Sequence, residues 1–231
     1  MAFTPPRPIR TVLFDLDGTL ADTAPDLAYA LNALLIERGR APLPYTAIRP
    51  VVSHGATALV QLGFTVATDS AEFSELRQRL LDLYRYNIAR ETRLFDGMPD
   101  VLRHIENAGL NWGVVTNKPA FLTEPLMAAL DLATRAICIV SGDTTARRKP
   151  HPDPLLHACR LAGSVAAQCL YIGDAERDIQ AGHDAGMPTL VATFGYLGAD
   201  DRPETWGADG LVHQPAEIIH WLDAELHAAA P

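Results

Sequence analysis

Two aspartates one residue apart, Asp15 and Asp17, directly follow a run of β-branched and aromatic residues over Thr11–Phe14. The run predicts a short buried strand, and Gly18 predicts the turn that ends it. The spacing places both carboxylates on the same side of the pleat, where they repel each other unless a cation neutralises the site. This suits a Mg²⁺-assisted nucleophilic carboxylate with an acid/base carboxylate beside it. The alternative is a strand-to-turn junction whose aspartates only satisfy backbone N–H groups.

Three further polar clusters follow predicted strands. Thr116 and Asn117 come after one strand and could bind a phosphoryl oxygen, or could simply cap a helix. Lys149 precedes a proline turn and could be catalytic, or could belong to a solvated basic loop. The segment Gly173–Asp178 places acidic groups where a strand passes into a helix, either as helix caps or as part of an oxygen-rich cation site.

Lysine is scarce in this chain. Of its 19 basic residues, 17 are arginine and only Lys118 and Lys149 are lysine. Because arginine is used wherever a general surface cation suffices, a retained lysine indicates a position that needs a compact point charge. This scarcity favours the functional interpretation of Lys149.

Composition excludes several classes of protein. The 231 residues carry a net charge of −9, which argues against nucleic-acid binding because phosphate backbones need a basic surface. No apolar run is long enough to span a membrane, and residues 1–10 lack the apolar core of a secretory signal, so we expect a frayed arm there. Cys138, Cys159 and Cys169 lie far apart in sequence, without a C-x-x-C pair, and we expect buried, reduced thiols in a cytoplasmic protein.

Hydrophobic periodicity divides the chain into two parts. Between Asp22 and Phe95 it predicts helices, with no strand and with a proline-bearing loop over Ala41–Pro50. The predicted helices of this part are Ala24–Arg38, Gly55–Leu62 and Ala71–Arg90. After Asp96, strands and helices alternate. The strands expected there are Trp112–Thr116, Ala136–Val140, Cys169–Ile172, Thr189–Thr193 and Gly210–Val212, and the helices are Met98–Ala108, Phe121–Leu130, Pro154–Ala162, Asp178–Ala185 and Ala216–Ala229.

Repeated β-α units of this length predict an α/β fold, with a Rossmann-like parallel sheet covered by helices on both faces. Ligands in such folds bind outside the carboxyl ends of the strands. The four polar clusters should therefore meet at one edge of the sheet.

In this order (D-x-D, Thr, Lys, G-D-x-x-x-D) the clusters resemble the four motifs of the haloacid dehalogenase superfamily of phosphohydrolases, over nearly the full chain. The segment Thr11–Leu20 matches the first motif in detail. The resemblance implies a core domain of residues 1–21 and 96–231 with an all-α cap domain of residues 22–95 inserted over the site.

The resemblance also implies the catalytic roles. Asp15 attacks phosphorus and forms an aspartyl-phosphate, while Asp17 protonates the leaving alcohol and then activates water. Lys149 compensates the negative charge, and Thr116 with the amide of Asn117 holds the phosphoryl group. The residues implied around Mg²⁺ are Asp15, the carbonyl of Asp17, Asp174 and, supporting the metal shell, Asp178.

Two features depart from the family pattern. Ala175 stands where many relatives have a polar residue, and His54-Gly55 replaces the usual Gly or Asn before Gly in the cap. His54, Gly55 and Arg49 are candidate substrate-binding residues, with Arg49 suited to a carboxylate. Surface positions are the alternative for His54 and Arg49.

The resemblance also limits the class of reaction that is expected. Asp17 argues against a dehalogenase, and the absence of lysine from residues 22–95 argues against a phosphonatase. We expect a phosphatase that acts on a small phosphate ester and is similar to phosphoglycolate phosphatases. The alternatives are a phosphatase of N-acetylmuramic acid 6-phosphate and a sugar phosphomutase. A scaffold without turnover would be expected to lose Asp15, Asp17 or Lys149. A monomer or homodimer is expected.

Overall fold

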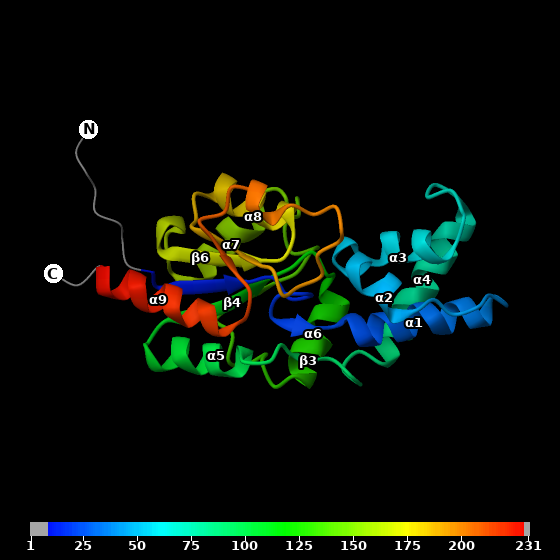
Figure 1. The fold of residues 1–231 in the computed structure, drawn as a ribbon, viewed down its shortest axis with the longest axis horizontal. Helices are drawn as coiled ribbons and strands as arrows, with labels where there is room; N and C mark the ends of the chain where they lie inside the picture. The colour runs from blue at the N-terminus through cyan, green and yellow to red at the C-terminus, as the bar shows by residue number, and fades with distance from the viewer. Residues whose placement is uncertain (1–8, 229–231) are drawn as a thin grey trace.

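The computed structural model describes residues 9–228 and contains a six-stranded sheet in the order β5-β4-β1-β6-β7-β8 (Figure 1). Every neighbouring pair in this sheet is parallel. The strands are β1 (Thr11–Phe14), β4 (Asn111–Val115), β5 (Ile139–Val140), β6 (Cys169–Gly173), β7 (Thr189–Ala192) and β8 (Gly210–Val212). The predicted α/β parallel-sheet core is confirmed.

Helices cover both faces of this sheet, as the alternation of side chains along a strand requires. Val12 and Phe14 of β1 pack into one buried cluster with α5 and α9, whereas Leu13 packs into another with α7 and α8. Figure 1 shows α5 and α9 on one side of the sheet and α7 and α8 on the other. The helices of this part are α5 (Met98–Asn107), α6 (Ala120–Ala129), α7 (Asp153–Ala162), α8 (Glu176–Ala185) and α9 (Ala216–Ala228), with short 3₁₀ turns η2 (Ala166–Gln168) and η3 (Pro203–Thr205).

Residues 22–95, which we call the helical insert, form a second group of helices beyond the carboxyl ends of the strands (Figure 1). They are α1 (Ala24–Glu37), α2 (Tyr45–Ile48), the 3₁₀ helix η1 (Arg49–His54), α3 (Gly55–Gly63) and α4 (Ala71–Tyr86). Their apolar side chains share a cluster of their own, which Leu122 of α6 and Tyr196 join from the sheet side. The division of the chain into two domains at these boundaries stays a prediction.

Three expectations for the insert are wrong in detail. A strand does lie in it: β3 (Arg93–Leu94) pairs antiparallel with β2 (Ala21–Asp22). The proline-bearing loop over Ala41–Pro50 contains α2 and the start of η1, and α4 ends at Tyr86 rather than at Arg90. Elements of two to four residues are too short to show a periodicity, so the pattern could not reveal them.

Long-range polar contacts fasten the insert where it joins the sheet. The Tyr196 hydroxyl accepts hydrogen bonds from the N–H groups of Thr23 (2.6 Å) and Ala24 (2.9 Å), and donates to Asp22 Oδ1 (2.7 Å). A tyrosine 173 positions away thereby satisfies the first amides of α1, which lack a cap from their own Thr23 side chain. Asp26 accepts hydrogen bonds from the N–H groups of Glu91 and Thr92 and binds α1 to the returning chain.

The three cysteines are free and buried, as expected. Cys159 and Cys169, which are 10 positions apart in the sequence, lie side by side in space with their sulfur atoms at 3.5 Å, because α7 and β6 share one buried cluster. Within residues 9–228, no helix combines the length and apolar character needed to cross a bilayer. The frayed arm predicted for residues 1–10 lies almost entirely outside the described residues, as does the predicted helix end at Ala229.

Candidate active site

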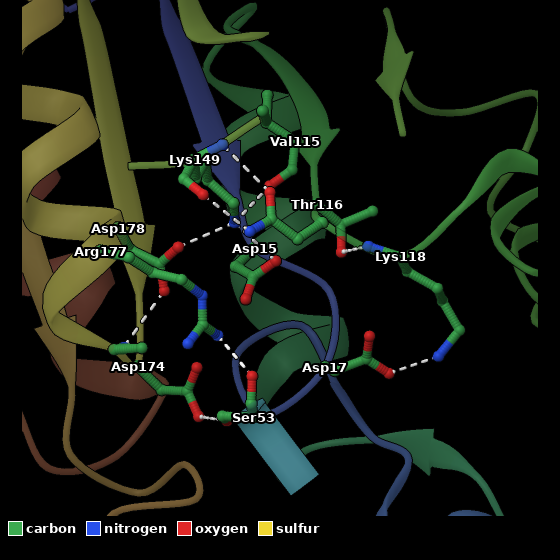
Figure 2. A network of polar contacts seen from close by, with 12 residues as sticks. Asp15, Asp17, Ser53, Val115, Thr116, Lys118, Lys149, Asp174, Arg177 and Asp178 are labelled. Carbon is green, nitrogen blue, oxygen red and sulfur yellow. Dashed lines mark hydrogen bonds and ion pairs between the residues drawn. The ribbon is translucent and has the colours of Figure 1, made fainter. Parts of the chain in front are cut away.

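The carboxyl ends of β1, β4 and β6 meet in the middle of the sheet, because β1 lies between the other two strands. Asp15 follows β1, Thr116 follows β4 and Asp174 follows β6, and all three side chains are buried. Figure 2 shows Asp15 at the centre of this group, with Lys149 on one side and Asp174 on the other. The predicted gathering of the clusters at one edge of the sheet is confirmed.

Lys149 is 2% exposed and surrounded by oxygen atoms. Its ammonium lies 2.9 Å from Asp15 Oδ1 and 2.8 Å from Asp178 Oδ1, and donates to the Val115 carbonyl (3.0 Å) and the Tyr171 hydroxyl (2.7 Å). Burial disfavours the charged ammonium, but Asp15 and Asp178 outweigh this cost and raise the pKa of Lys149. The site therefore holds a permanent positive charge against Asp15.

Opposing effects act on the pKa of the Asp15 carboxyl. Burial raises the pKa of its carboxyl, the Lys149 ammonium lowers it, and the nearby charge of Asp178 raises it again, with a net upward shift. A carboxylate that is desolvated in this way is more reactive toward an electrophile than one in water. Of the two motif aspartates, Asp15 is the one in contact with Lys149.

Asn117 holds the backbone of Lys149 in place. Its side-chain amide donates to the Lys149 carbonyl (2.9 Å), and its side-chain oxygen accepts from the Lys149 N–H (3.1 Å). The carbonyl of Asn117 also packs so closely on Gly142 that a Cβ there would lie 2.2 Å from it. The sequence suggested Asn117 as a phosphoryl-binding amide or as a helix cap, and the contact of its side chain with the Lys149 backbone was not predicted.

The Asp17 carboxylate turns away from the cluster around Asp15. Its Oδ1 lies 2.7 Å from the Lys118 ammonium and accepts a hydrogen bond from the Thr23 hydroxyl (2.6 Å), and Figure 2 shows it directed toward Lys118. The three carboxylates that do converge are Asp15, Asp174 and Asp178. The spacing predicted that Asp15 and Asp17 repel each other, and the charge of Asp17 does raise the pKa of Asp15, but the Asp17 carboxylate is paired with Lys118 and does not join the cluster around Asp15.

Asp15, Asp174 and Asp178 could hold a hard cation. One oxygen of each lies within 4.8 Å of the others, and oxygen atoms are the ligands that such cations prefer. Asp174 Oδ1 is buried without a hydrogen-bond partner in the described chain, whereas its Oδ2 accepts from Ser53 and from the N–H of Tyr196. Burial and the charges of Asp15 and Asp178 raise the pKa of Asp174 to about 7.

Within this group Asp178 has a different position from the other two. Its Oδ1 is paired with Lys149, and its Oδ2 accepts from the N–H of Ala175 at 3.1 Å, so both oxygens are engaged. The last contact caps α8. Asp178 is therefore better placed to fix Lys149 than to bind a cation directly.

A cavity of about 490 Å³ lies between the sheet edge and the helical insert. It is lined by most of the predicted site residues, namely Asp15, Asp17, His54, Gly55, Thr116, Asn117 and Lys149. Arg49 is not among the lining residues. Its guanidinium donates to the carbonyls of Gly195 (3.0 Å) and Phe194 (3.2 Å) and lies over the Tyr196 ring, so in this structure it joins the insert to the core instead of facing the cavity.

Sequence reasoning missed Ser53 and Arg177. The Ser53 hydroxyl donates to Asp174 (2.7 Å), and the Arg177 guanidinium donates to the Ser53 carbonyl (2.7 Å), so η1 of the insert touches the edge of the core that carries Asp174. Both residues line the cavity. The position of Arg177 next to Asp178 in the fourth cluster could have drawn attention to it, whereas nothing in the sequence around Ser53 indicated this contact.

A model of the haloacid dehalogenase-like hydrolase family matches residues 12–192, a segment that contains all four clusters. The chain belongs to this family. The resemblance inferred from the motifs is thereby confirmed.

Individual relatives of this hydrolase carry two different names. The chain is 45% identical to an N-acetylmuramic acid 6-phosphate phosphatase of Pseudomonas aeruginosa, over 94% of this chain and 96% of the relative. It is 46% identical to a phosphoglycolate phosphatase of Xylella fastidiosa, over 89% and 90%. A crystal structure described as a predicted phosphoglycolate phosphatase from Haemophilus somnus superposes with a TM-score of 0.81 at 27% identity, covering 92% of this chain and 97% of that one.

Proposed function

We propose that this hydrolase is a Mg²⁺-dependent phosphomonoesterase that forms an aspartyl-phosphate on Asp15. The observation that carries the proposal is the buried Asp15 carboxylate, which lines the cavity and touches the Lys149 ammonium at 2.9 Å. Phosphoryl transfer depends mainly on positioning and on charge neutralisation, and the groups around Asp15 supply both.

The first chemical step forms one bond and breaks one. A carboxylate oxygen of Asp15 attacks phosphorus, and the bond between phosphorus and the ester oxygen breaks. Asp17 gives a proton to that oxygen, so the alcohol leaves neutral. Thr116 and the amide of Asn117 hold the phosphoryl oxygens, and Lys149 balances their charge.

The second step returns the enzyme to its starting state. Asp17 takes a proton from a water molecule, whose oxygen attacks phosphorus while the bond between phosphorus and Asp15 breaks. Inorganic phosphate leaves. Mg²⁺ held by Asp15 and Asp174 would neutralise the charge that accumulates between the carboxylates and the phosphoryl group.

For the substrate, the size of the cavity favours a sugar phosphate. Cavities of about 300–1,000 Å³ enclose ligands of drug size, and the cavity of about 490 Å³ here falls within that range. 2-Phosphoglycolate, with a two-carbon skeleton, would leave most of it to water. We therefore place N-acetylmuramic acid 6-phosphate ahead of 2-phosphoglycolate, although relatives of both names are equally similar to the chain.

The test is phosphate release from a panel of monoesters by the purified protein with Mg²⁺. The panel contains p-nitrophenyl phosphate, N-acetylmuramic acid 6-phosphate, 2-phosphoglycolate and glucose 1-phosphate. The Asp15→Asn variant, nearly the same in shape, is the control for contaminating phosphatases. We expect Asp15-dependent release with the highest kcat/KM for the N-acetylmuramate ester. Conversion of glucose 1-phosphate to its 6-phosphate without phosphate release would instead support the mutase alternative.

A further inference from the structure

Three side chains of α4, a helix of the insert, line the cavity: Arg77, Leu81 and Tyr84. They are four and three residues apart, so they lie in one stripe along the helix. We call them the α4 stripe. It runs from the half of α4 that holds Tyr84, next to the reacting groups, toward the N-terminal half that holds Arg77.

Tyr84 marks the inner end of the stripe. The Lys118 ammonium, which is paired with Asp17, lies 4.5 Å from the centre of the Tyr84 ring. The Tyr84 hydroxyl is buried and interacts with the Lys118 ammonium, and it donates no hydrogen bond to an acceptor within residues 9–228. Burial raises the pKa of this hydroxyl to about 12, so it remains a protonated donor. A buried donor without an acceptor is costly, and a ligand hydroxyl or ether oxygen would accept its hydrogen bond.

Arg77 lies at the outer end, where its side chain is exposed to solvent and has no ion-pair partner within residues 9–228. In the part of the chain that the structure describes, its guanidinium makes no hydrogen bond or ion pair, although it lines the cavity. The neighbouring Arg79 is bound through two hydrogen bonds to Glu37, and Arg38, the residue after α1, is paired with Glu75 of α4. In a chain of net charge −9, a free guanidinium at a cavity wall favours an anionic ligand group.

The length of the stripe limits what can reach both ends. Seven residues of α-helix rise about 10 Å, so the backbone positions of Arg77 and Tyr84 are about 10 Å apart along the helix axis. A carboxylate on the far side of a sugar ring spans more of this distance than a carboxylate two bonds from the ester oxygen.

We propose that the α4 stripe is a substrate-binding subsite in which Arg77 binds a carboxylate carried by a sugar-sized phosphomonoester, at the end opposite the phosphate. Leu81 contacts the sugar face, and the Tyr84 hydroxyl donates to an oxygen near the ester. The inference rests on the proposed phosphatase activity and adds the residue that selects an acidic sugar phosphate over a neutral one.

The experiment compares two substrates that differ in one substituent. N-Acetylmuramic acid 6-phosphate carries a lactyl carboxylate, whereas N-acetylglucosamine 6-phosphate lacks it. We measure kcat/KM for both with the wild type and with Arg77→Met, which keeps an unbranched apolar side chain. The preference for the carboxylate-bearing substrate is expected to fall about 10- to 100-fold in Arg77→Met, as for loss of a charged hydrogen bond, and mainly through KM.

Arg79→Met is the matched control, because Arg79 lies on the same helix outside the cavity and is paired with Glu37. It should retain the wild-type preference. The Tyr84→Phe variant should lower kcat/KM for both sugar phosphates to the same extent. An unchanged preference in Arg77→Met, or an equal loss in Arg79→Met, overturns the subsite.

The possible failures are distinguishable. If the wild type hydrolyses p-nitrophenyl phosphate but neither sugar phosphate, the phosphatase proposal stands and the α4 subsite is wrong. If it hydrolyses no phosphomonoester, the proposed function itself is wrong.

Discussion

The Lys118 ammonium lies 2.7 Å from Asp17 Oδ1, and this pair is almost completely shielded from solvent on the lysine side. Lys118 was one of only two lysines in the chain, and the motifs assigned a role only to the other. Burial opposes the charge on Lys118, but Asp17 outweighs it and raises the pKa of Lys118. The two lysines thus serve the two motif aspartates separately, Lys149 beside Asp15 and Lys118 beside Asp17.

Replacing Lys118 by methionine should reduce catalysis by freeing the Asp17 carboxylate from its position. If Asp17 protonates the leaving oxygen, the loss should depend on the leaving group. An alkyl phosphate needs that proton, whereas p-nitrophenolate leaves without it. We expect kcat/KM for the alkyl ester to fall at least about 10-fold more than for p-nitrophenyl phosphate. Equal losses for both esters would assign Lys118 to general phosphate attraction instead.

The variants Asp15→Asn and Asp17→Asn should fail in different ways. Asp15→Asn removes the nucleophile and should form no phosphoenzyme at all. Asp17→Asn should slow both steps by roughly 10²–10⁴-fold, the usual contribution of general acid/base catalysis. Rapid quenching with a phosphate-labelled substrate, followed by peptide mapping, locates the label. Label on Asp17, Asp174 or a serine would contradict the assignment to Asp15.

Lys149→Arg should not be conservative, because four oxygen-bearing groups enclose the ammonium and leave little room for a planar guanidinium. We expect a loss of about 2–4 kcal/mol in transition-state stabilisation from kcat/KM, together with a lower melting temperature. In Lys149→Met the free energy of unfolding should be lower than in the wild type by about 3–5 kcal/mol, since this variant leaves Asp15 and Asp178 without their counter-charge. Urea unfolding with activity assays separates the two effects. Near-native turnover in Lys149→Arg would show that charge alone is needed at this position.

Metal-free stability should depend on pH through Asp174. Its pKa of about 7 lies above the ordinary value, so between about pH 4 and pH 7 the native state holds a proton that the unfolded chain has released. This contribution makes unfolding easier as pH rises through that window. In EDTA, the melting temperature of Asp174→Asn relative to that of the wild type should therefore rise as the pH is raised from about 5 to about 8.

Magnesium should reverse the order of the two melting temperatures, so that the wild type becomes more stable than Asp174→Asn. At a concentration about 100 times its Kd, a cation that binds only the folded state stabilises it by about 2.7 kcal/mol. Mg²⁺ at about pH 8 should thus raise the melting temperature of the wild type and have much less effect on Asp174→Asn. Equal shifts in both proteins would place the cation elsewhere.

The sheet and most of the site were predictable because the signals are local. Runs such as Thr11–Phe14 are buried on both faces and read as strands, and a polar residue directly after a strand marks the sheet edge. Parallel topology then brings Asp15, Thr116 and Asp174 together without further information.

What could not be predicted depends on contacts between distant segments. The hydrogen bond from the Thr23 N–H to the Tyr196 hydroxyl joins residues 173 positions apart, and the ion pair of Lys118 with Asp17 joins residues 101 positions apart. Arg49 has the chemistry of a carboxylate binder, and only packing of η1 against the 194–196 segment occupies its guanidinium. Local sequence patterns do not indicate which distant segments will contact each other.

The two-stranded ribbon of β2 and β3 also explains how an excursion of some seventy residues can be tolerated inside a parallel-sheet protein. Ala21 lies opposite Leu94 and Asp22 opposite Arg93, so the chain leaves and returns at adjacent points. For the rest of the protein the excursion is one closed loop, and each doubling of a loop's length adds only about 0.6 kcal/mol of closure entropy. Most of the chain beyond this ribbon can therefore change in length or sequence, and with it the range of esters admitted, while the strands of the sheet keep their register.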